Sequence, residues 1–276
     1  MNDFISANLR KLKYYKIPNP EIDLRILLNH SRYSENEIIF SNFNKNKINI
    51  KKFNSLLKRR LLDEPISKII NKKSFWKDDF YVNNFVLDPR PETEGIIEEA
   101  IKIFNNKKNH LKILDIGTGS GALAISLARE FENIEIVAID ISEDALKVAN
   151  KNIKDKNFDK KIILKKTIFE NIEDDFDLIV SNPPYLTLKE IKTLSNEIKQ
   201  FEPKIALFGG KDGLDFYREF SKKIYKNLNS GGHLILEIGA SQFSDCREIF
   251  SNSGLKFIKK SQDLQKKDRI MIFSKI

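Results

Sequence analysis

The spacing of apolar residues changes once along the chain, near residue 75. Before this point apolar side chains recur at every third or fourth position, the spacing that lines one face of an α-helix. No segment there alternates apolar and polar residues as a half-exposed strand does. The helical spacing is seen in FISANLRKL, EIDLRILLNHS, ENEIIFSNF and INIKKFNSLLKRRLL, which start at residues 4, 21, 35 and 48. We therefore predict a small helical bundle over residues 1–74.

A short segment of different character follows the helical part. Residues 75–90 read FWKDDFYVNNFVLDPR, in which FYV and FVL are short β-prone runs. These runs flank Asn83-Asn84, a pair typical of tight turns. The pattern predicts a β-hairpin that links two domains, with Phe75 and Trp76 packing it against one of them.

From residue 91 to residue 276, apolar runs of strand length alternate with helical patterns. This alternation is typical of a mostly parallel sheet covered by helices on both faces. The last two strands are close in sequence, so we expect one antiparallel edge strand. The predicted strands are 111–116, 134–140, 161–165, 176–181, 233–238, 255–260 and 269–274, and the predicted helices are 92–104, 121–130, 142–152, 190–199, 213–228 and 241–251. We predict an α/β domain with a Rossmann-like, seven-stranded sheet over residues 91–276.

The composition excludes several classes of protein. With 41% hydrophobic and 32% charged residues, the chain resembles an ordinary soluble globular protein. The one cysteine, Cys246, cannot form an internal disulfide. It lies in a predicted helix, where we expect it to serve packing rather than chemistry. Three scattered histidines provide no zinc-ligand spacing, so no metal site is expected. We find neither a signal-peptide pattern nor an apolar run of about 18 residues, and therefore expect a cytoplasmic protein without a membrane span.

The positive charge is unevenly distributed. The formal net charge is +9, and residues 1–75 hold 16 Lys and Arg against 7 Asp and Glu, so the remainder is neutral. Such an excess can indicate an acidic or nucleic-acid partner for the helical part. It can also reflect the abundance of Lys, Asn and Ile that is typical of AT-rich genomes. Both explanations stay open. No long apolar surface stripe requires a second copy, and we expect a monomer.

Two stretches at strand ends indicate a nucleoside cofactor. ILDIGTGSGALAISLA, residues 113–128, reads as a strand, a glycine-rich turn and a helix. Its G-x-G-x-G spacing differs from the G-x-G-x-x-G dinucleotide fingerprint. Asp140 ends the next strand about 20 residues later, where an acid can accept hydrogen bonds from ribose hydroxyls. Asp140 could instead cap the following helix, although Ser142 is the better candidate for that role. Together with Asp115, this pattern favours S-adenosylmethionine over NAD.

A third strand end carries the stretch SNPPYL, residues 181–186. Proline restricts its own backbone and favours an extended conformation in the residue before it. The side-chain carbonyl of Asn182 and the backbone carbonyl of Pro183 could therefore face one point as two rigid acceptors. Such a pair suits the –NH2 of an amide or a nucleobase, while Tyr185 can pack flat against the planar group. The carboxyl ends of the strands bring this stretch to the same rim as the glycine turn.

Planar –NH2 groups are poor nucleophiles because the nitrogen lone pair is delocalised. Holding both N–H bonds orients the nitrogen and favours its rehybridisation, so that the lone pair can point at a sulfonium methyl group. A strong base is unnecessary, because methylation makes the nitrogen more acidic and the proton can leave later. Catalysis of this kind depends on positioning and electrostatics.

Further stretches carry a resemblance to one family. EPISKII, VLDPRPETE, NPPYL, FEPKIALFGGKDGLDFYR, LEIGASQ and KDR start at residues 64, 86, 182, 201, 236 and 267. Together they resemble the bacterial release factor glutamine methyltransferases, the PrmC/HemK family, over nearly the whole chain. The resemblance implies a class I methyltransferase domain that uses S-adenosylmethionine. It also implies methylation of the side-chain amide nitrogen (N5) of the Gln in the Gly-Gly-Gln motif of class I peptide chain release factors.

The resemblance also implies roles for individual residues. The glutamine amide would be bound by Asn182, Pro183, Pro184 and Tyr185, of which Asn182, Pro183 and Tyr185 are the expected catalytic residues. The cofactor would be bound by Asp115, Gly117, Thr118, Gly119, Ser120, Gly121, Asp140, Ile141, Thr167, Ile168 and Asn182.

The chain departs from the family pattern at a few positions. The family usually has Asp, a large apolar residue and Phe beside the adenine, whereas this chain has Thr167-Ile168-Phe169, so we expect only the apolar packing to be kept. Asp88 stands where the family usually has Ile or Thr before Pro-Arg-Pro. Asn71 or a neighbour replaces a usual Gly. These last two changes concern the segment between the domains.

Several alternatives stay open. The same motifs would suit a DNA or rRNA amino-methyltransferase acting on adenine N6 or guanine N2, or a non-catalytic protein that binds S-adenosylmethionine. We expect the helical bundle to recognise the body of the release factor, without a requirement for nucleic acid. The charged residues of the family stretches can either contact substrate or stabilise the fold; they are Arg90, Glu92, Glu94, Glu202 and Glu237.

Overall fold

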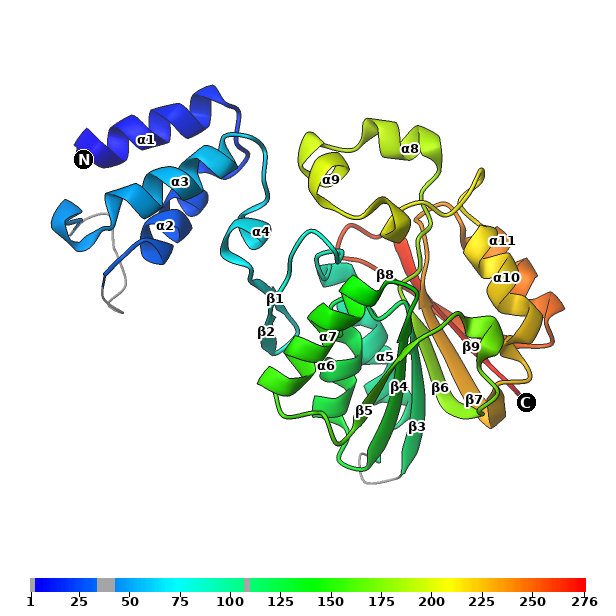
Figure 1. Cartoon of the computed structure of the whole chain (residues 1–276). Coiled ribbons are helices and arrows are strands. Elements are labelled where there is room, and N and C mark those ends of the chain that lie inside the picture. The colour runs from blue at the N-terminus through cyan, green and yellow to red at the C-terminus, as the bar shows by residue number, and fades with distance from the viewer. Residues whose placement is uncertain (1–2, 34–42, 107–109) are drawn as a thin grey trace. The chain divides into compact units, whose positions relative to one another are not determined.

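The computed structural model describes residues 3–33, 43–106 and 110–276 (Figure 1). The chain forms two compact units. The first comprises Met1–Asn71 with Ser195–Phe201, and the second comprises Lys72–Leu194 with Glu202–Ile276. The predicted boundary at residue 74 is therefore three residues late, and one short segment from the second half of the sequence belongs to the first unit.

The first unit is helical, as predicted. Its elements are α1 (Asp3–Tyr14), α2 (Pro20–His30), the 3-10 helix η2 (Lys45–Lys47), α3 (Ile50–Arg60), α4 (Ile66–Ile70) and α9 (Asn196–Phe201). Leu12, Leu24 and Phe53 are completely buried in its core, which explains the three- and four-residue spacing. Arg60 is buried as well and forms an ion pair with Asp23 at 2.7 Å, which joins α3 to α2. Most of the predicted helix ENEIIFSNF lies outside the described residues.

The second unit contains a seven-stranded sheet in the order β5-β4-β3-β6-β7-β9-β8 (Figure 1). Strands β3 to β7 are parallel, and β9 is antiparallel to both β7 and β8. The bounds are β3 (Leu111–Ile116), β4 (Ile134–Asp140), β5 (Ile162–Lys166), β6 (Phe176–Ser181), β7 (Leu228–Glu237), β8 (Lys256–Gln262) and β9 (Asp268–Ser274). The predicted α/β class is confirmed, and each predicted strand is found, although β7 begins five residues earlier than expected.

Helices cover both faces of this sheet (Figure 1). Ile113 packs into one apolar cluster and its neighbour Leu114 into the other, as expected for successive residues of a strand. The first cluster includes Ile97 of α5 and Leu127 of α6, and the second includes Phe220 of α10. The helices are α5 (Glu94–Ile103), α6 (Ala122–Glu130), α7 (Glu143–Asp155), α8 (Leu188–Thr193), α10 (Asp215–Ile224) and α11 (Phe243–Asn252), with the 3-10 helices η3 (Pro91–Thr93), η4 (Phe169–Asn171) and η5 (Lys204–Ala206).

The predicted position of the hairpin is wrong. Its strands are β1 (Lys73–Phe75) and β2 (Asp78–Phe80), so the chain turns at Trp76, which has a φ of 53°, and not at Asn83-Asn84. The Asn83 side chain instead accepts a hydrogen bond from the Phe85 backbone N–H at 3.0 Å, a local turn that replaces strand pairing. The hairpin is also part of the second unit, because Phe75 and Phe80 are buried in that unit's core.

One predicted helix, residues 190–199, is two helices in the structure. The chain is extended at Leu194, between α8 and α9. Thr187 and Glu190 form a capping box, which starts α8 two residues before the predicted helix. The Ser195 hydroxyl accepts from the Ile198 backbone N–H at 3.4 Å and so starts a new helix.

Candidate functional site

A cavity of about 350 Å³ opens in the second unit, where β3, β4 and β6 end. The sheet order reverses between β3 and β6, and ligands of open α/β sheets bind at such a point. The cavity is within the size range of small-molecule pockets. Most of the predicted site residues line it: Asp115, Gly117, Thr118, Gly119, Ser120, Asp140, Ile141, Thr167, Ile168, Asn182 and Pro184. Gly121, Pro183 and Tyr185 are not part of its lining.

The glycine turn opens its backbone to this cavity. Gly117 and Gly119 have φ angles of 73° and 55°, which side chains rarely tolerate. A Cβ on Gly117 would meet no atom within 4 Å, and one on Gly119 would meet only the Gly117 carbonyl at 3.9 Å. A Cβ on Gly121 would instead lie 3.3 Å from the Cβ of Ala149. Gly121 therefore serves the packing of α6 against α7, and the first two glycines leave room for a ligand.

Asp140 connects the end of β4 to the glycine turn. Its two carboxylate oxygens accept from the backbone N–H groups of Gly119 at 3.0 Å and Ser142 at 2.9 Å. Each oxygen keeps a further lone pair that can accept from a ligand hydroxyl. The helix α7 is capped by Ser142, whose hydroxyl accepts from the Ala145 N–H, as the sequence predicted. Asp140 is therefore rigid and still able to bind a diol.

Asp115 is a buried acid at the end of β3. It accepts a hydrogen bond from the Thr118 hydroxyl at 2.7 Å. Burial raises the pKa of Asp115 to about 7, and the nearby charge of Asp140 adds to this effect. Near neutral pH the Asp115 carboxyl is therefore divided between its protonated and ionised forms.

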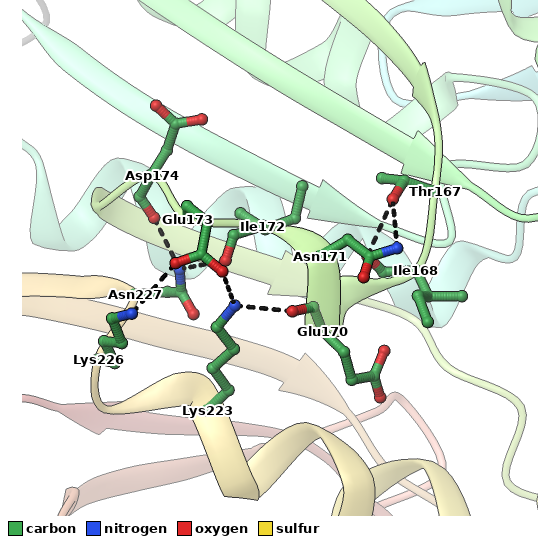
Figure 2. A network of polar contacts seen from close by, with 10 residues as sticks. All are labelled: Thr167, Ile168, Glu170, Asn171, Ile172, Glu173, Asp174, Lys223, Lys226 and Asn227. Atoms are coloured by element: carbon green, nitrogen blue, oxygen red, sulfur yellow. Dashed lines mark hydrogen bonds and ion pairs between the residues drawn. The ribbon is translucent and has the colours of Figure 1, made fainter.

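The loop after β5 lines the cavity with Ile168 and Phe169. Figure 2 shows the polar contacts that stabilise this loop. Lys223 of α10 donates to the Glu170 carbonyl and forms an ion pair with Glu173, both at 2.7 Å. The Asn227 amide donates to the backbone carbonyls of Ile172 at 3.0 Å and Asp174 at 2.8 Å. These contacts keep the loop, with Ile168 and Phe169, in place against the cavity.

Thr167 occupies the position where the family pattern usually has Asp. Its hydroxyl donates to the Ile168 carbonyl at 3.3 Å and accepts from the Asn171 amide at 3.5 Å (Figure 2). The hydroxyl is thus used within the loop.

Asn182 is held by one half of its side-chain amide. Its Nδ2 donates to the Thr93 hydroxyl at 2.8 Å. Within the part of the chain that the structure describes, no group donates to Asn182 Oδ1 or to the Pro183 carbonyl. The two acceptors predicted from the sequence therefore have no hydrogen-bond donor from the described protein.

Glu237, at the end of β7, binds Tyr185 of the NPPY stretch and Thr93, the partner of Asn182. It is 1% exposed, and it accepts from the Thr93 hydroxyl at 2.6 Å and from the Tyr185 hydroxyl at 3.1 Å. Burial raises the pKa of Glu237 to about 6, and it also raises the pKa of Tyr185. The Tyr185 carbonyl accepts from the Gln242 amide at 3.1 Å. Glu237 thus contacts protein groups of the motif, one of the two roles that the sequence left open.

Other charged residues of the family stretches also bond to the protein. Glu202 is buried and accepts from the Asp88 backbone N–H at 3.2 Å and from the Arg90 guanidinium at 3.2 Å. Glu94 accepts from the Trp76 backbone N–H at 2.7 Å and so stabilises the hairpin turn. These contacts give Glu94, Glu202 and Arg90 a structural role. The alternative of substrate contact, which the sequence left open for Arg90, Glu92 and Glu94, stays open.

Sequence reasoning missed a large part of the lining. Residues 85–89, which the hairpin prediction treated as a link between domains, form one side of the cavity. Pro203, Ile205 and Ala206 form another part. Both segments lie in stretches that carried the family resemblance, and this was the available signal. Phe216 of α10, in the second of these stretches, also lines the cavity. So do Glu219 and Phe220 of the same helix, which lie outside the stretches and which nothing in the helical pattern distinguished.

The described part of the chain has neither a grouped set of metal ligands nor a helix that could cross a membrane. Across residues 3–33, 43–106 and 110–276, no three His, Cys, Asp or Glu side chains are grouped to hold a metal ion. In the same ranges, every helix is too short or too polar to cross a membrane.

Comparisons with known proteins agree with this geometry. A family model described as methyltransferase small domain matches residues 100–200. The chain is 36% identical to a bifunctional methyltransferase of Rickettsia bellii, covering 99% of this chain and 54% of that protein. It is 35% identical to a release factor glutamine methyltransferase of Caulobacter vibrioides, covering 95% of this chain and 92% of that protein. The chain therefore spans about half the length of the first relative and nearly all of the second.

A solved structure shows the same fold. A methyltransferase from Pyrococcus furiosus aligns with a TM-score of 0.54 and 21% identity, covering 79% of this chain and 98% of that one. At this identity the likeness concerns the fold alone.

Proposed function

The chain belongs to the release factor glutamine methyltransferase family, and we propose that it methylates the Gly-Gly-Gln glutamine of class I peptide chain release factors. The methyl group comes from S-adenosylmethionine and is transferred to the N5 nitrogen of the glutamine side chain. The protein acts in the cytosol as a monomer, and its helical unit recognises the body of the release factor. The positive charge of residues 1–75 supports this last role.

The cavity fits the proposed cofactor. S-adenosylmethionine supplies, when bound, a methyl group made electrophilic by its sulfonium. Gly117 and Gly119 leave room for a ligand close to the backbone, and Asp140 can accept from ribose hydroxyls. Ile168 and Phe169 offer apolar packing for a flat base. Asn182 lines the same cavity, so the methyl acceptor is held next to the cofactor.

One observation carries the proposed reaction. Asn182 Oδ1 and the Pro183 carbonyl are acceptors that no described residue uses, whereas Asn182 Nδ2 is already bonded to Thr93. A primary amide has two N–H bonds to donate, which matches two acceptors. Binding both N–H groups orients the amide nitrogen and favours the rehybridised form that attacks a methyl group. The protein therefore contributes positioning and electrostatic stabilisation rather than a strong base.

The first test is mass spectrometry of a purified release factor after incubation with the protein and S-adenosylmethionine. We expect a gain of about 14 Da, one methyl group in place of hydrogen, on the tryptic peptide that contains the Gly-Gly-Gln motif, and loss of that gain in Asn182→Ala. Asn133→Ala, which changes an exposed asparagine outside the cavity, is the matched control and should methylate normally.

An unmethylated peptide in the presence of bound cofactor would contradict the proposed substrate. The amino groups of adenine and guanine would then be the next acceptors to test, because the same pair of carbonyls suits them. Steep salt dependence of binding to random duplex DNA or tRNA would favour that alternative. Cofactor binding without turnover on any of these substrates would indicate a non-catalytic protein.

A further inference from the structure

We propose that Thr93 and Glu237 are positioning residues that determine which way the Asn182 amide faces, so that its oxygen points to the substrate. This inference rests on the proposed function, because it explains how one of the two acceptors for the glutamine amide is presented. It assigns a task to a threonine that lies in one of the family stretches without a predicted role, and to a glutamate whose role the sequence left open.

The three side chains form a short hydrogen-bonded chain. Asn182 Nδ2 donates to Thr93 Oγ1 at 2.8 Å, and Thr93 Oγ1 donates to Glu237 Oε2 at 2.6 Å. Thr93 ends η3 and is 5% exposed, and Glu237 ends β7 and is 1% exposed. The chain of contacts is therefore shielded from water, where each donor needs its acceptor.

The direction of these bonds follows from chemistry. An ionised carboxylate can only accept, and a hydroxyl has a single proton to donate. Because the Thr93 hydroxyl uses its one proton in the hydrogen bond to Glu237, the Thr93 oxygen can only accept from Asn182. It must therefore face the Asn182 nitrogen. The two ends of an asparagine amide are nearly the same size, and hydrogen-bond partners decide between them. The Glu237 charge thus determines that Asn182 Oδ1 faces away from Thr93.

The alternative arrangement shows why this matters. If Glu237 carried a proton, the Thr93 hydroxyl could be turned to donate to Asn182 Oδ1. The Asn182 –NH2 would then face the –NH2 of a glutamine substrate, donor against donor. Such a reversal would remove an acceptor without changing the shape of the site.

The same carboxylate also holds the other end of the NPPY stretch. Glu237 Oε1 accepts from the Tyr185 hydroxyl at 3.1 Å. Arg269, on the neighbouring strand β9, favours the ionised form of Glu237, whereas burial and Glu92 of η3 oppose it. The Tyr217 hydroxyl of α10 donates to the backbone carbonyl of Glu237, at 3.1 Å, and not to its carboxylate. With these groups around it, Glu237 has a pKa of about 6 and is mostly ionised at neutral pH.

The kinetic test compares Thr93→Val with Thr93→Ser. Valine keeps the shape and loses the hydroxyl, whereas serine keeps the hydroxyl. We expect kcat at saturating cofactor to fall by about 30- to 100-fold in Thr93→Val, the effect of a misplaced reacting group, and by less than about 3-fold in Thr93→Ser. Glu237→Gln should behave like Thr93→Val, since a neutral amide no longer imposes one direction on the hydroxyl. Full activity in both Thr93→Val and Glu237→Gln would overturn the proposal.

Thermal unfolding separates positioning from a structural role. Because the folded-state pKa of Glu237 is raised, its ionised form is disfavoured in the native protein. Removing the charge in Glu237→Gln should therefore leave Tm at pH 8 unchanged or higher, while activity falls. A parallel loss of Tm and activity would indicate that Glu237 only stabilises the fold.

An NMR measurement tests the proposal without turnover. In the full chain labelled with ¹⁵N-asparagine, the Asn182 side-chain amide signals can be assigned by their absence in Asn182→Ala. We expect them to shift with a midpoint near pH 6, and this titration should disappear in Glu237→Gln and in Thr93→Val. Asn182 signals that do not respond to either change would refute the inference. If they respond as expected but release factor is not methylated, the positioning stands and the proposed substrate fails.

Discussion

The two ends of the cavity are built in different ways. At the cofactor end, residues 117–121 form one continuous turn, and Asp140 is held by backbone N–H groups. At the acceptor end, Asn182 is held by Thr93, which lies 89 positions away in the sequence, and Thr93 is held by Glu237, which lies 144 positions away. One end depends on local backbone conformation, and the other depends on side chains brought together by the fold.

Because of this difference, we expect substitutions at the two ends to change different quantities. A change at the cofactor end alters a binding surface made of backbone and one carboxylate, so it should act on cofactor affinity. A change at the acceptor end alters the orientation of reacting groups, so it should act on kcat. The predictions that follow test this separation.

The largest effect is expected for Asn182→Ala. Losing one of the two acceptors should lower kcat by about 10³-fold, the scale seen when one preorganised hydrogen-bonding group is removed from an active site. The cofactor Kd should rise by less than about 10-fold, as expected for the loss of one neutral contact. Steady-state kinetics with a Gly-Gly-Gln peptide and calorimetry with S-adenosylmethionine measure the two quantities. Equal losses in kcat and in cofactor affinity would assign Asn182 to the cofactor end and contradict the separate roles of the two ends.

Asp140→Ala should show the opposite behaviour. Two hydrogen bonds to a charged group are lost, so cofactor Kd should rise by about 10²-fold. At saturating cofactor, kcat should stay within about 3-fold of the original value because the acceptor end is unchanged. Calorimetry and kinetics again provide the measurement. Asp144→Ala, which changes a half-exposed acid on α7 that pairs with Lys147, is the matched control and should change neither quantity.

Charge reversal in the helical unit should affect only the protein substrate. The exposed residues Lys51, Lys52 and Lys58 changed together to Glu should raise KM for intact release factor by about 5- to 10-fold through lost electrostatic attraction. KM for a short Gly-Gly-Gln peptide and the cofactor Kd should stay constant. Equal effects on peptide and intact factor would contradict a recognition role. Reversal of three exposed lysines of the second unit, Lys154, Lys160 and Lys256, serves as the control.

The smallest effect is expected in the pH dependence of stability. The folded-state pKa of Asp115 is raised to about 7, so the native protein binds a proton that the unfolded chain has released above its ordinary pKa of about 4. Stability should therefore fall as pH rises through about 7. Asp115→Asn should reduce this slope and raise Tm at pH 8 by about 2–4 °C, which thermal unfolding at pH 6 and pH 8 measures. An unchanged slope would show that Asp115 is not a source of this dependence.

Much of the second unit could be predicted because its signals are local. The strand and helix patterns of residues 91–276 repeat within short windows, and the strands were found within a few residues. The hairpin was misplaced because Asn83-Asn84 is a strong turn signal that here forms a side-chain turn rather than pairing strands. The break at Leu194 was missed because Ser195 competes with a continuing helix only through its own side chain.

The site shows the same division. The glycine turn, Asp140 and the NPPY stretch could be identified as candidates, since each is a short motif at a strand end. The roles of Thr93 and Glu237 could not be predicted, because a buried threonine and a buried glutamate have no distinctive spacing. The lining by residues 85–89 was also hidden, because nothing local indicates which side of a sheet a connecting segment covers.

The sequence by itself therefore determined the order of strands and helices, the left-handed glycine turn and the rigid pair of carbonyls in NPPY. These features follow from backbone sterics, which act between neighbouring residues. The fold brings Thr93 between Glu237 and Asn182, and it places Lys223 of α10 against the loop after β5 (Figure 2). Neither arrangement could be read from the sequence. Hydrogen bonds and burial act between residues that are close in space, and folding brings those residues together from distant parts of the chain.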